Sequence, residues 1–486
     1  MKIISKIILT VILSAAVASV VKAQIKTVTL DQVLDMVINS SFAQRTASLQ
    51  KQGAEQSYLF YRSQLRPTLS LTADIPNYSK TSAPVTQPDG SISFQSIRQA
   101  NSNIGLSASQ VISATGGTLF ATSQINRFDD YSNEFKQYNG IPVRIGIIQP
   151  IIGFNPWKYR KRIEPLLLQE AEKTYQVSIE EALLTATRLY FDILIADQNL
   201  KIAQSNRGVN ENLLNITNER FTLGKVSKDE QLQLKMELNQ SRLQVSQASY
   251  SRSEALVALY SFLGMEADTT AIFTTPSKLE PASISIPDVL AAYSANRPEV
   301  IAYQRELAEA ESGIAEAKAM FGLGATIRAS YGLARGADNV TDIYTDPFTE
   351  QQANLSISVP ILDWGRKKTA VAQQVINKQN IEANYEQQLL ELEANIKQRC
   401  YLLGSLQREL ILLKDIMDTA DTRAQISNER YVLGDIDITN LTIAQREKDQ
   451  AKRTYINALQ TYWTTYYQLR ALTGYDVITD SPIIYQ

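Results

Sequence analysis

The sequence predicts a mainly α-helical protein with a membrane β-barrel part, built from two tandem structural repeats. Three observations support this fold class. The chain contains a long internal duplication, it has two very long stretches without proline, and it has four short segments in which polar and apolar residues alternate. Proline-free stretches favour helix, and strict alternation favours half-buried strands.

The duplication appears as pairs of similar segments, separated by one constant offset in the C-terminal part of each copy and by another in the N-terminal part. The stretch NERFTLGKVS at residues 218–227 returns as NERYVLGDID at residues 428–437, an offset of 210. Nearer the N-terminus, LDQVLDMV at Leu30 matches IPDVLAAY at Ile286, an offset of 256. The difference of 46 residues is an insertion in the first copy, between residues 73 and 145. Internal repeats of this length indicate the architecture of the whole chain.

The repeats divide the chain into five parts. We expect a signal peptide at residues 1–23, a first repeat at 24–264, a linker at 265–286, a second repeat at 287–474 and a C-terminal tail at 475–486.

The first 23 residues have the pattern of a secretory signal. Lys2 and Lys6 precede an apolar run from Ile7 to Val21, and we expect cleavage before Gln24. A retained membrane anchor is the alternative, but the run is shorter than the ~20 residues of a spanning helix. No later apolar run is long enough either, so an exported chain that enters a membrane would do so as a closed β-barrel.

Composition excludes several kinds of site. The chain has no histidine and a single cysteine, Cys400, and its net charge is −2. Histidine-dependent catalysis, histidine metal sites and intrachain disulfides are therefore excluded, and no basic face for nucleic acid is indicated. GLGAT at Gly322 is the nearest approach to a phosphate loop, but it follows a helix and precedes a strand, which is the wrong order. We expect no catalytic residues, no cofactor and no metal.

Two long helices are predicted, one in each repeat. In the first copy the helix runs from Trp157 to Phe221, roughly 100 Å at 1.5 Å per residue, with Asn155 as its N-cap. Asp363 occupies the matching place in the second copy. Each long helix carries an apolar seam with three- and four-residue spacing, which is typical of coiled coils. In the second copy the seam is Leu389, Leu392, Ile396, Leu403, Leu406, Leu410, Leu413, Met417, Ala420, Ala424 and Tyr431.

Shorter helices are expected to lie against the long ones. We expect one of about 37 residues to end at Gly264, a C-terminal glycine stop, and another to run from about Leu30 to Arg66. In each copy, one long helix would then pair with two helices of half its length.

Four segments alternate between a polar and an apolar face, centred on residues 69–75, 143–147, 326–333 and 354–359. Any one of them could be a sandwich strand, but four in repeat register behind a secretory signal favour an outer-membrane barrel. Four strands cannot enclose a water-filled pore, so several chains must share one barrel. The insertion holds a further hairpin candidate, and residues 102–127 either add strands or form an external loop.

The repeats, the PILDWG joint between strand and helix, and the ER-aromatic-x-LG turn together resemble the TolC-like outer-membrane efflux proteins, the outer membrane factors. The resemblance covers nearly the whole chain after the signal peptide. It implies a homotrimer that shares a twelve-stranded barrel in outer-membrane lipid, continued into the periplasm by a tunnel of helices. It also implies docking to a periplasmic adaptor coupled to an inner-membrane pump, for efflux or type I secretion. A periplasmic coiled-coil structural protein is the alternative, but it would leave the strands unexplained.

The resemblance also implies roles for named residues. Leu223, Gly224, Leu433 and Gly434 would form adaptor-docking tips, although glycine could simply end a helix there and leucine could simply pack. The candidate gate consists of Lys225, Lys228, Asp229, Tyr431, Asp435 and Asp437, and its charged members could instead be solvated loop residues. Trp157, Trp364 and Arg366 are expected at the membrane–water interface, with a solvated first helical turn as the alternative.

Overall fold

The computed structural model describes residues 27–276 and 284–485 and contains two compact units. The helical unit comprises the described parts of Met1–Gln50, Lys173–Arg297 and Glu391–Gln486. The sheet unit comprises Lys51–Glu172 and Pro298–Leu390. Both repeats contribute to both units. The predicted signal peptide and part of the predicted linker lie outside the described residues.

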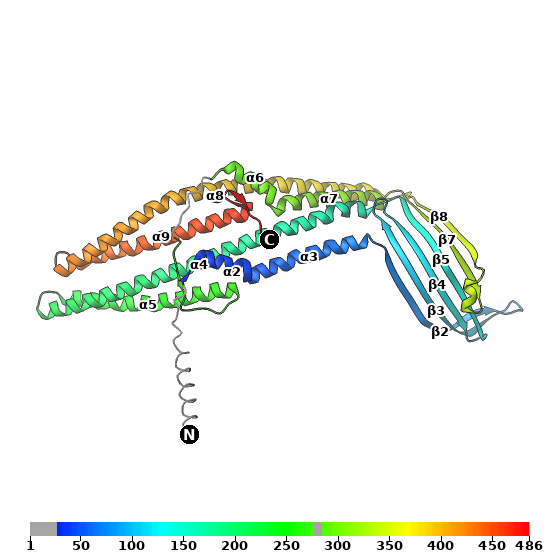
Figure 1. Ribbon diagram of the computed structural model, residues 1–486, viewed down its shortest axis with the longest axis horizontal. Coiled ribbons are helices and arrows are strands. Elements are labelled where there is room, and N and C mark those ends of the chain that lie inside the picture. Colours follow the sequence, from blue (N-terminus) through cyan, green and yellow to red (C-terminus); the bar gives the residue numbers. More distant parts are fainter. Residues whose placement is uncertain (1–26, 277–283, 486) are drawn as a thin grey trace, which may run out of the picture. The chain divides into compact units, whose positions relative to one another are not determined.

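The two long helices are confirmed. They are α4, Pro156–Thr222, and α8, Arg366–Leu433, each followed by a 36-residue partner, α5 at Lys228–Leu263 and α9 at Ile438–Thr473 (Figure 1). All positions of the predicted seam in the second copy are buried or half-buried, as coiled-coil packing requires. Both partner helices end at a glycine in the left-handed conformation, as expected for glycine C-caps.

The predicted caps differ between the two copies. Asn155 caps α4, with Oδ1 accepting the N–H of Trp157 at 3.0 Å. Asp363 lies three residues before α8 and accepts the N–H groups of Gly365 at 3.0 Å and Lys367 at 3.2 Å. These hydrogen bonds hold the pKa of the Asp363 carboxyl below its usual value. The second joint therefore takes an extra turn through Trp364 and Gly365, which both have positive φ, before the helix starts.

The half-length helix that begins each repeat is broken into two, contrary to the expectation of one continuous helix. The first becomes α2, Leu30–Ser40, and α3, Phe42–Gln64. Between them, the Ser41 hydroxyl donates to the carbonyl of Val37 at 2.8 Å and accepts the N–H of Gln44 at 3.0 Å, so it ends one helix and caps the next. In the second copy, α6 at Ile286–Asn296 and α7 at Pro298–Met320 are separated by Arg297, which is extended because proline follows it.

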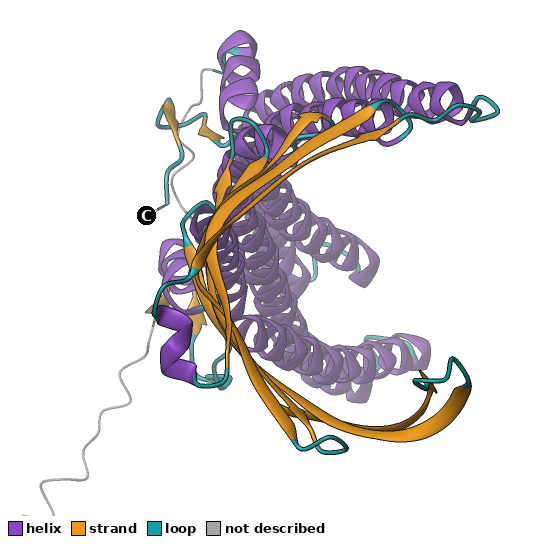
Figure 2. Cartoon of the chain, turned by 90° about the vertical axis from the view of Figure 1, so that its right-hand side faces the viewer, coloured by secondary structure: helices purple, strands orange, loops and turns teal. Residues whose placement is uncertain are grey.

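One antiparallel sheet of six strands, in the order β2-β3-β4-β5-β7-β8, dominates the sheet unit and is strongly curved (Figure 2). The four predicted strands are present. Of the two alternatives left open for residues 102–127, the first holds: the insertion forms a hairpin that adds β3 and β4 to the sheet. The hairpin turns at Gly116, which has a φ of +76°. The strands are β2 Thr68–Thr86, β3 Ile92–Ile112, β4 Gly117–Asp130, β5 Phe135–Ile152, β7 Gly324–Ala337 and β8 Phe348–Ser358.

Smaller elements complete the chain. In the helical unit, β1 (Thr27–Val28) pairs in parallel with β6 (Ile272–Phe273), and β9 (Tyr475–Asp476) pairs with β10 (Ser481–Pro482). A short 3-10 helix, Val340–Tyr344, joins β7 to β8. Among the helices that the structure describes, none combines the length and the apolar character required to cross a bilayer.

The sheet separates polar from apolar side chains. Residues directly opposite each other on paired strands share a face. Leu71 pairs with Leu106, and Ile145 pairs with Tyr331, which places these four side chains on one face. The alternate positions of the same strands are mainly polar. Pro142, which cannot donate to a neighbouring strand, lies in a bulge of the central strand β5, where no ladder hydrogen bond is lost.

Candidate functional site

Two hairpin tips join the long helices to their partners within the helical unit. Gly224 and Gly434 have φ of +67° and +89°, the left-handed conformation that glycine adopts without steric cost. At the second tip, the N–H of Asp435 donates to the carbonyl of Arg430 at 2.9 Å, the long hydrogen bond of a Schellman turn. The glycines thus have a structural role at both tips.

The leucines beside the two glycines do not pack into the core. Leu223 is 68% exposed and Leu433 is 76% exposed. These two side chains are therefore not packed within the chain, which was the alternative. An exposed leucine at each tip is available to a partner protein. Adaptor docking remains a prediction.

Tyr431 lies in a buried cluster beneath the tips. Its side chain is 2% exposed and packs in a cluster with residues from the other three helices of the two hairpins. Its hydroxyl lies 3.4 Å from Oε1 of Glu230 on α5. Burial, chiefly, raises the pKa of the Tyr431 hydroxyl, so it stays protonated and can donate this hydrogen bond. The cluster comprises Leu213, Leu234, Tyr431, Ile438 and Leu441.

Arg220 adds a second link between the two tips. Its Nη2 donates to the carbonyl of Val432 at 3.2 Å, and its guanidinium lies 5.8 Å from the centre of the Tyr431 ring. Arg220 and Glu230 are therefore contact residues that sequence reasoning did not select. The repeated NER word was the available signal for Arg220, but Glu230 lies outside that word and only the fold brings it to Tyr431.

The charged residues of the candidate gate have different surroundings. Asp437 is the N-cap of α9 and accepts the N–H of Asn440 at 2.8 Å. Lys228 donates to Oε1 of Gln231 at 2.5 Å and lies 5.1 Å above the ring of Phe221. The remaining members are exposed; these are Lys225, Asp229 and Asp435.

The expected interface residues lie where strands pass into helices, in the sheet unit. Trp157 is half-buried, with the guanidinium of Arg160 5.0 Å from its ring centre. Arg160 pairs in turn with Glu164 at 2.7 Å, which offsets a cation in the first turn of a helix. Trp364 is 87% exposed, and the guanidinium of Arg366 lies 5.3 Å from the ring centre of Phe321. A solvated turn would not favour a bare tryptophan, whereas a lipid headgroup region would.

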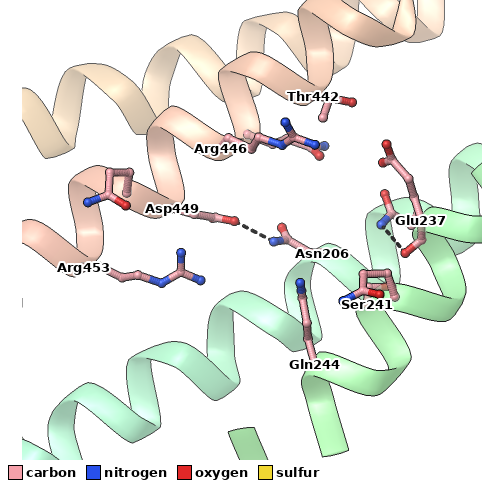
Figure 3. A pocket seen from close by; sticks show the side chains of 12 residues that line it. Asn206, Glu237, Ser241, Gln244, Thr442, Arg446, Asp449 and Arg453 are labelled. Atoms are coloured by element: carbon pink, nitrogen blue, oxygen red, sulfur yellow. Dashed lines mark hydrogen bonds between the residues drawn. The ribbon is translucent and has the colours of Figure 1, made fainter. Parts of the chain in front are cut away.

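A pocket among α4, α5 and α9 was not anticipated, because its residues come from three helices (Figure 3). Asn206 donates from Nδ2 to Oδ2 of Asp449 at 2.6 Å, and the Asp449 side chain is almost fully buried. The pocket is lined by two acidic residues, Glu237 and Asp449, and two basic residues, Arg446 and Arg453, so the formal charges of its lining cancel. All of its lining residues are polar: Asn206, Asn210, Glu237, Gln240, Ser241, Gln244, Thr442, Gln445, Arg446, Asp449, Gln450 and Arg453.

Comparisons with solved structures confirm the fold. The outer-membrane channel CmeC of Campylobacter jejuni superposes with a TM-score of 0.66 at 16% identity, covering 92% of this chain and 85% of that one. The open state of the Neisseria gonorrhoeae channel MtrE superposes with a TM-score of 0.64 at 17% identity, covering 92% and 88%.

Sequence comparisons agree with the structural ones. The chain is 22% identical over 280 residues to the pyoverdine export outer membrane protein OpmQ of Pseudomonas aeruginosa, and the match spans 57% of each protein. The model of the outer membrane efflux protein family matches residues 93–265 and 289–475, which is most of the chain. The resemblance to TolC-like proteins is thereby confirmed: the chain belongs to the outer membrane efflux protein family, whose members are outer-membrane channels with a periplasmic extension.

Proposed function

We propose that this protein is one third of a trimeric outer-membrane channel through which substrates leave passively, delivered by a periplasmic adaptor and an inner-membrane pump. The channel, the adaptor and the pump would together form a tripartite efflux or type I secretion system. Because the family is one of transport channels, we propose no catalytic role and no cofactor.

The two-faced sheet is the observation that carries this proposal. Leu71, Ile145 and Leu355 lie on its apolar face and are 70%, 60% and 56% exposed. A continuous apolar surface of this kind is unfavourable in water but suits lipid chains. The two outer strands, β2 and β8, each have one unpaired edge, so a single chain leaves the sheet open. Closure by other copies satisfies both edges.

The exposed tips support the partner assignment. Leu223 and Leu433 are the apolar residues that an adaptor could cover, and the repeat places one on each hairpin. A coiled-coil structural protein remains the second candidate because the long helices alone would suit it. This second candidate does not explain why the sheet has an exposed apolar face.

Assembly and conduction test the proposal together. We expect the protein extracted in mild detergent to have the mass of a trimer by light scattering, and to give stepwise conductance in a planar bilayer. A stable monomer that stays in solution without detergent would contradict it and favour the structural alternative.

A further inference from the structure

We infer that the insertion widens the membrane wall, so that three copies of this chain close a barrel of eighteen strands rather than twelve. The inference rests on the proposed trimeric channel and goes beyond it, because it concerns what each copy contributes to the wall. The inserted hairpin is the pair β3 and β4, joined by the turn at Gly116.

The hairpin is paired on both sides along its length. Strand β3 pairs with β2 from Thr68 to Thr86, and β4 pairs with β5 from Thr118 to Asp130. The insertion therefore lies between two strands that would otherwise be neighbours. A loop outside the wall, or a plug within it, would leave β2 free to pair directly with β5.

The hairpin continues both faces of the sheet. On the apolar face, Leu71 pairs with Leu106, and Ile104 pairs with Ile125. On the polar face, the hydroxyl oxygens of Ser70 and Ser107 are 2.7 Å apart. An external loop has no requirement for this alternation, whereas a strand between lipid and a water-filled lumen does.

An aromatic ring of the hairpin packs closely against a glycine of the neighbouring strand β5. Phe120 of β4 lies opposite Gly146 of β5. A Cβ at position 146 would overlap both the ring of Phe120 and the backbone carbonyl of Ala329 on β7, so glycine allows β5 close approach to the neighbours on both sides. The ring of Phe120 thus fills part of the space that Gly146 leaves, in the same way as a neighbouring strand of one continuous wall.

The stagger of the strands matches a barrel wall. One row of paired residues begins at Thr68, the first residue of β2, and reaches Gln352 in β8, six positions before the last residue of that strand, Ser358. Six residues over five strand spacings correspond to a tilt of about 40°, within the range of closed barrels. This row passes through both inserted strands, by way of Ser109 and Phe120.

Strand number also permits closure. The six strands alternate in direction, so β2 and β8 are antiparallel and can pair between neighbouring copies. An insertion of two strands preserves this relationship, whereas an insertion of one would not. At the same tilt and a strand spacing of about 4.8 Å, eighteen strands give a backbone diameter of about 36 Å, against about 24 Å for twelve. The exit through the membrane is then wider than in a twelve-stranded relative.

Spin labels on the two faces of the hairpin test the inference in the full-length protein in lipid bilayers. Cys400 is first replaced by alanine, and single cysteines then replace Ile104 or Ala121 on the apolar face and Ser107 on the polar face. Ile145→Cys in β5 is the matched control on a framework strand. Collision with oxygen, which dissolves in lipid, is compared with collision with a water-soluble nickel chelate.

We expect the labels at Ile104, Ala121 and Ile145 to favour oxygen equally and the label at Ser107 to favour the chelate. Chelate access at both hairpin faces, with oxygen preference kept at Ile145, overturns the inference and leaves the channel proposal standing. Chelate access at Ile145 as well overturns the proposed membrane channel itself. Electron cryo-microscopy of the trimer provides the direct count, eighteen strands if the hairpin belongs to the wall and twelve if it does not.

Discussion

Arg470 of α9 forms a two-pronged ion pair with Glu180 of α4, with Nη2 2.8 Å from Oε1 and Nε 3.1 Å from Oε2. The Glu180 side chain is 2% exposed. Arg470 also lies 3.2 Å from Asp476, which follows the same helix, so one guanidinium serves two carboxylates. This pair ties the first repeat to the second within the helical unit.

Replacing Arg470 by methionine should destabilise the helical unit by about 3–5 kcal/mol, because the Glu180 charge would remain buried without its cation. The measurement is the unfolding midpoint of the helices by circular dichroism. Arg423→Met is the matched control, since the Arg423–Glu447 pair is half exposed and should contribute no more than about 1 kcal/mol. Equal midpoints for the two variants would mean that the buried pair is not stabilising.

Replacing Leu433 by aspartate should abolish efflux and leave the trimer intact. The change adds a charge to a side chain that is 76% exposed at a tip, outside the core and on the surface that we propose an adaptor covers. Survival in the presence of a pump substrate and trimer mass report the two effects separately. Leu433→Met, which keeps the apolar surface, should behave as wild type. Loss of the trimer with aspartate would instead make this leucine an assembly residue.

Replacing Tyr431 by phenylalanine should loosen the contact between the two tips without emptying the core. The change removes the hydroxyl that lies 3.4 Å from Glu230 and keeps the buried ring. A net hydrogen bond contributes about 1 kcal/mol, so stability should change little. Single-channel conductance should rise if this contact helps to hold the channel closed, and Glu230→Gln should act in the same direction. Unchanged conductance in both variants would remove Tyr431 from the candidate gate.

Converting Asp435 and Asp437 to asparagine should lower cation selectivity and weaken block by multivalent cations from the periplasmic side. In a trimer these carboxylates would be repeated around one opening, and neighbouring charges at a few ångströms interact by on the order of 1 kcal/mol. Asparagine at position 437 keeps the N-cap of α9, because it caps helices as well as aspartate does. Reversal potentials at low salt, where screening is least, measure the effect. Identical potentials in the double variant and wild type would identify both as solvated loop charges.

The duplication, the long helices, the tips and the two faces of each framework strand could all be predicted from the amino-acid sequence alone. Each of these features depends on local periodicity or on the positions of glycine and proline, and both are visible in a single sequence. The NERF and NERY words located both turns, and the alternation at residues 69–75 and 354–359 located both edge strands. The proposal that the apolar face of the sheet meets lipid depends on the same alternation.

The way in which distant segments meet could not be predicted without the folded chain. The hairpin was visible in the insertion, but its place between β2 and β5 depends on pairing that no local pattern encodes. The breaks at Ser41 and Arg297, by contrast, have local causes: a serine that caps the next helix and a proline that follows Arg297. Glu180 and Arg470 are 290 positions apart, and each alone reads as an ordinary charged residue of a helix. Their burial depends on which helices pack together, because a side chain's solvent exposure is a property of the folded chain and not of its neighbours in sequence.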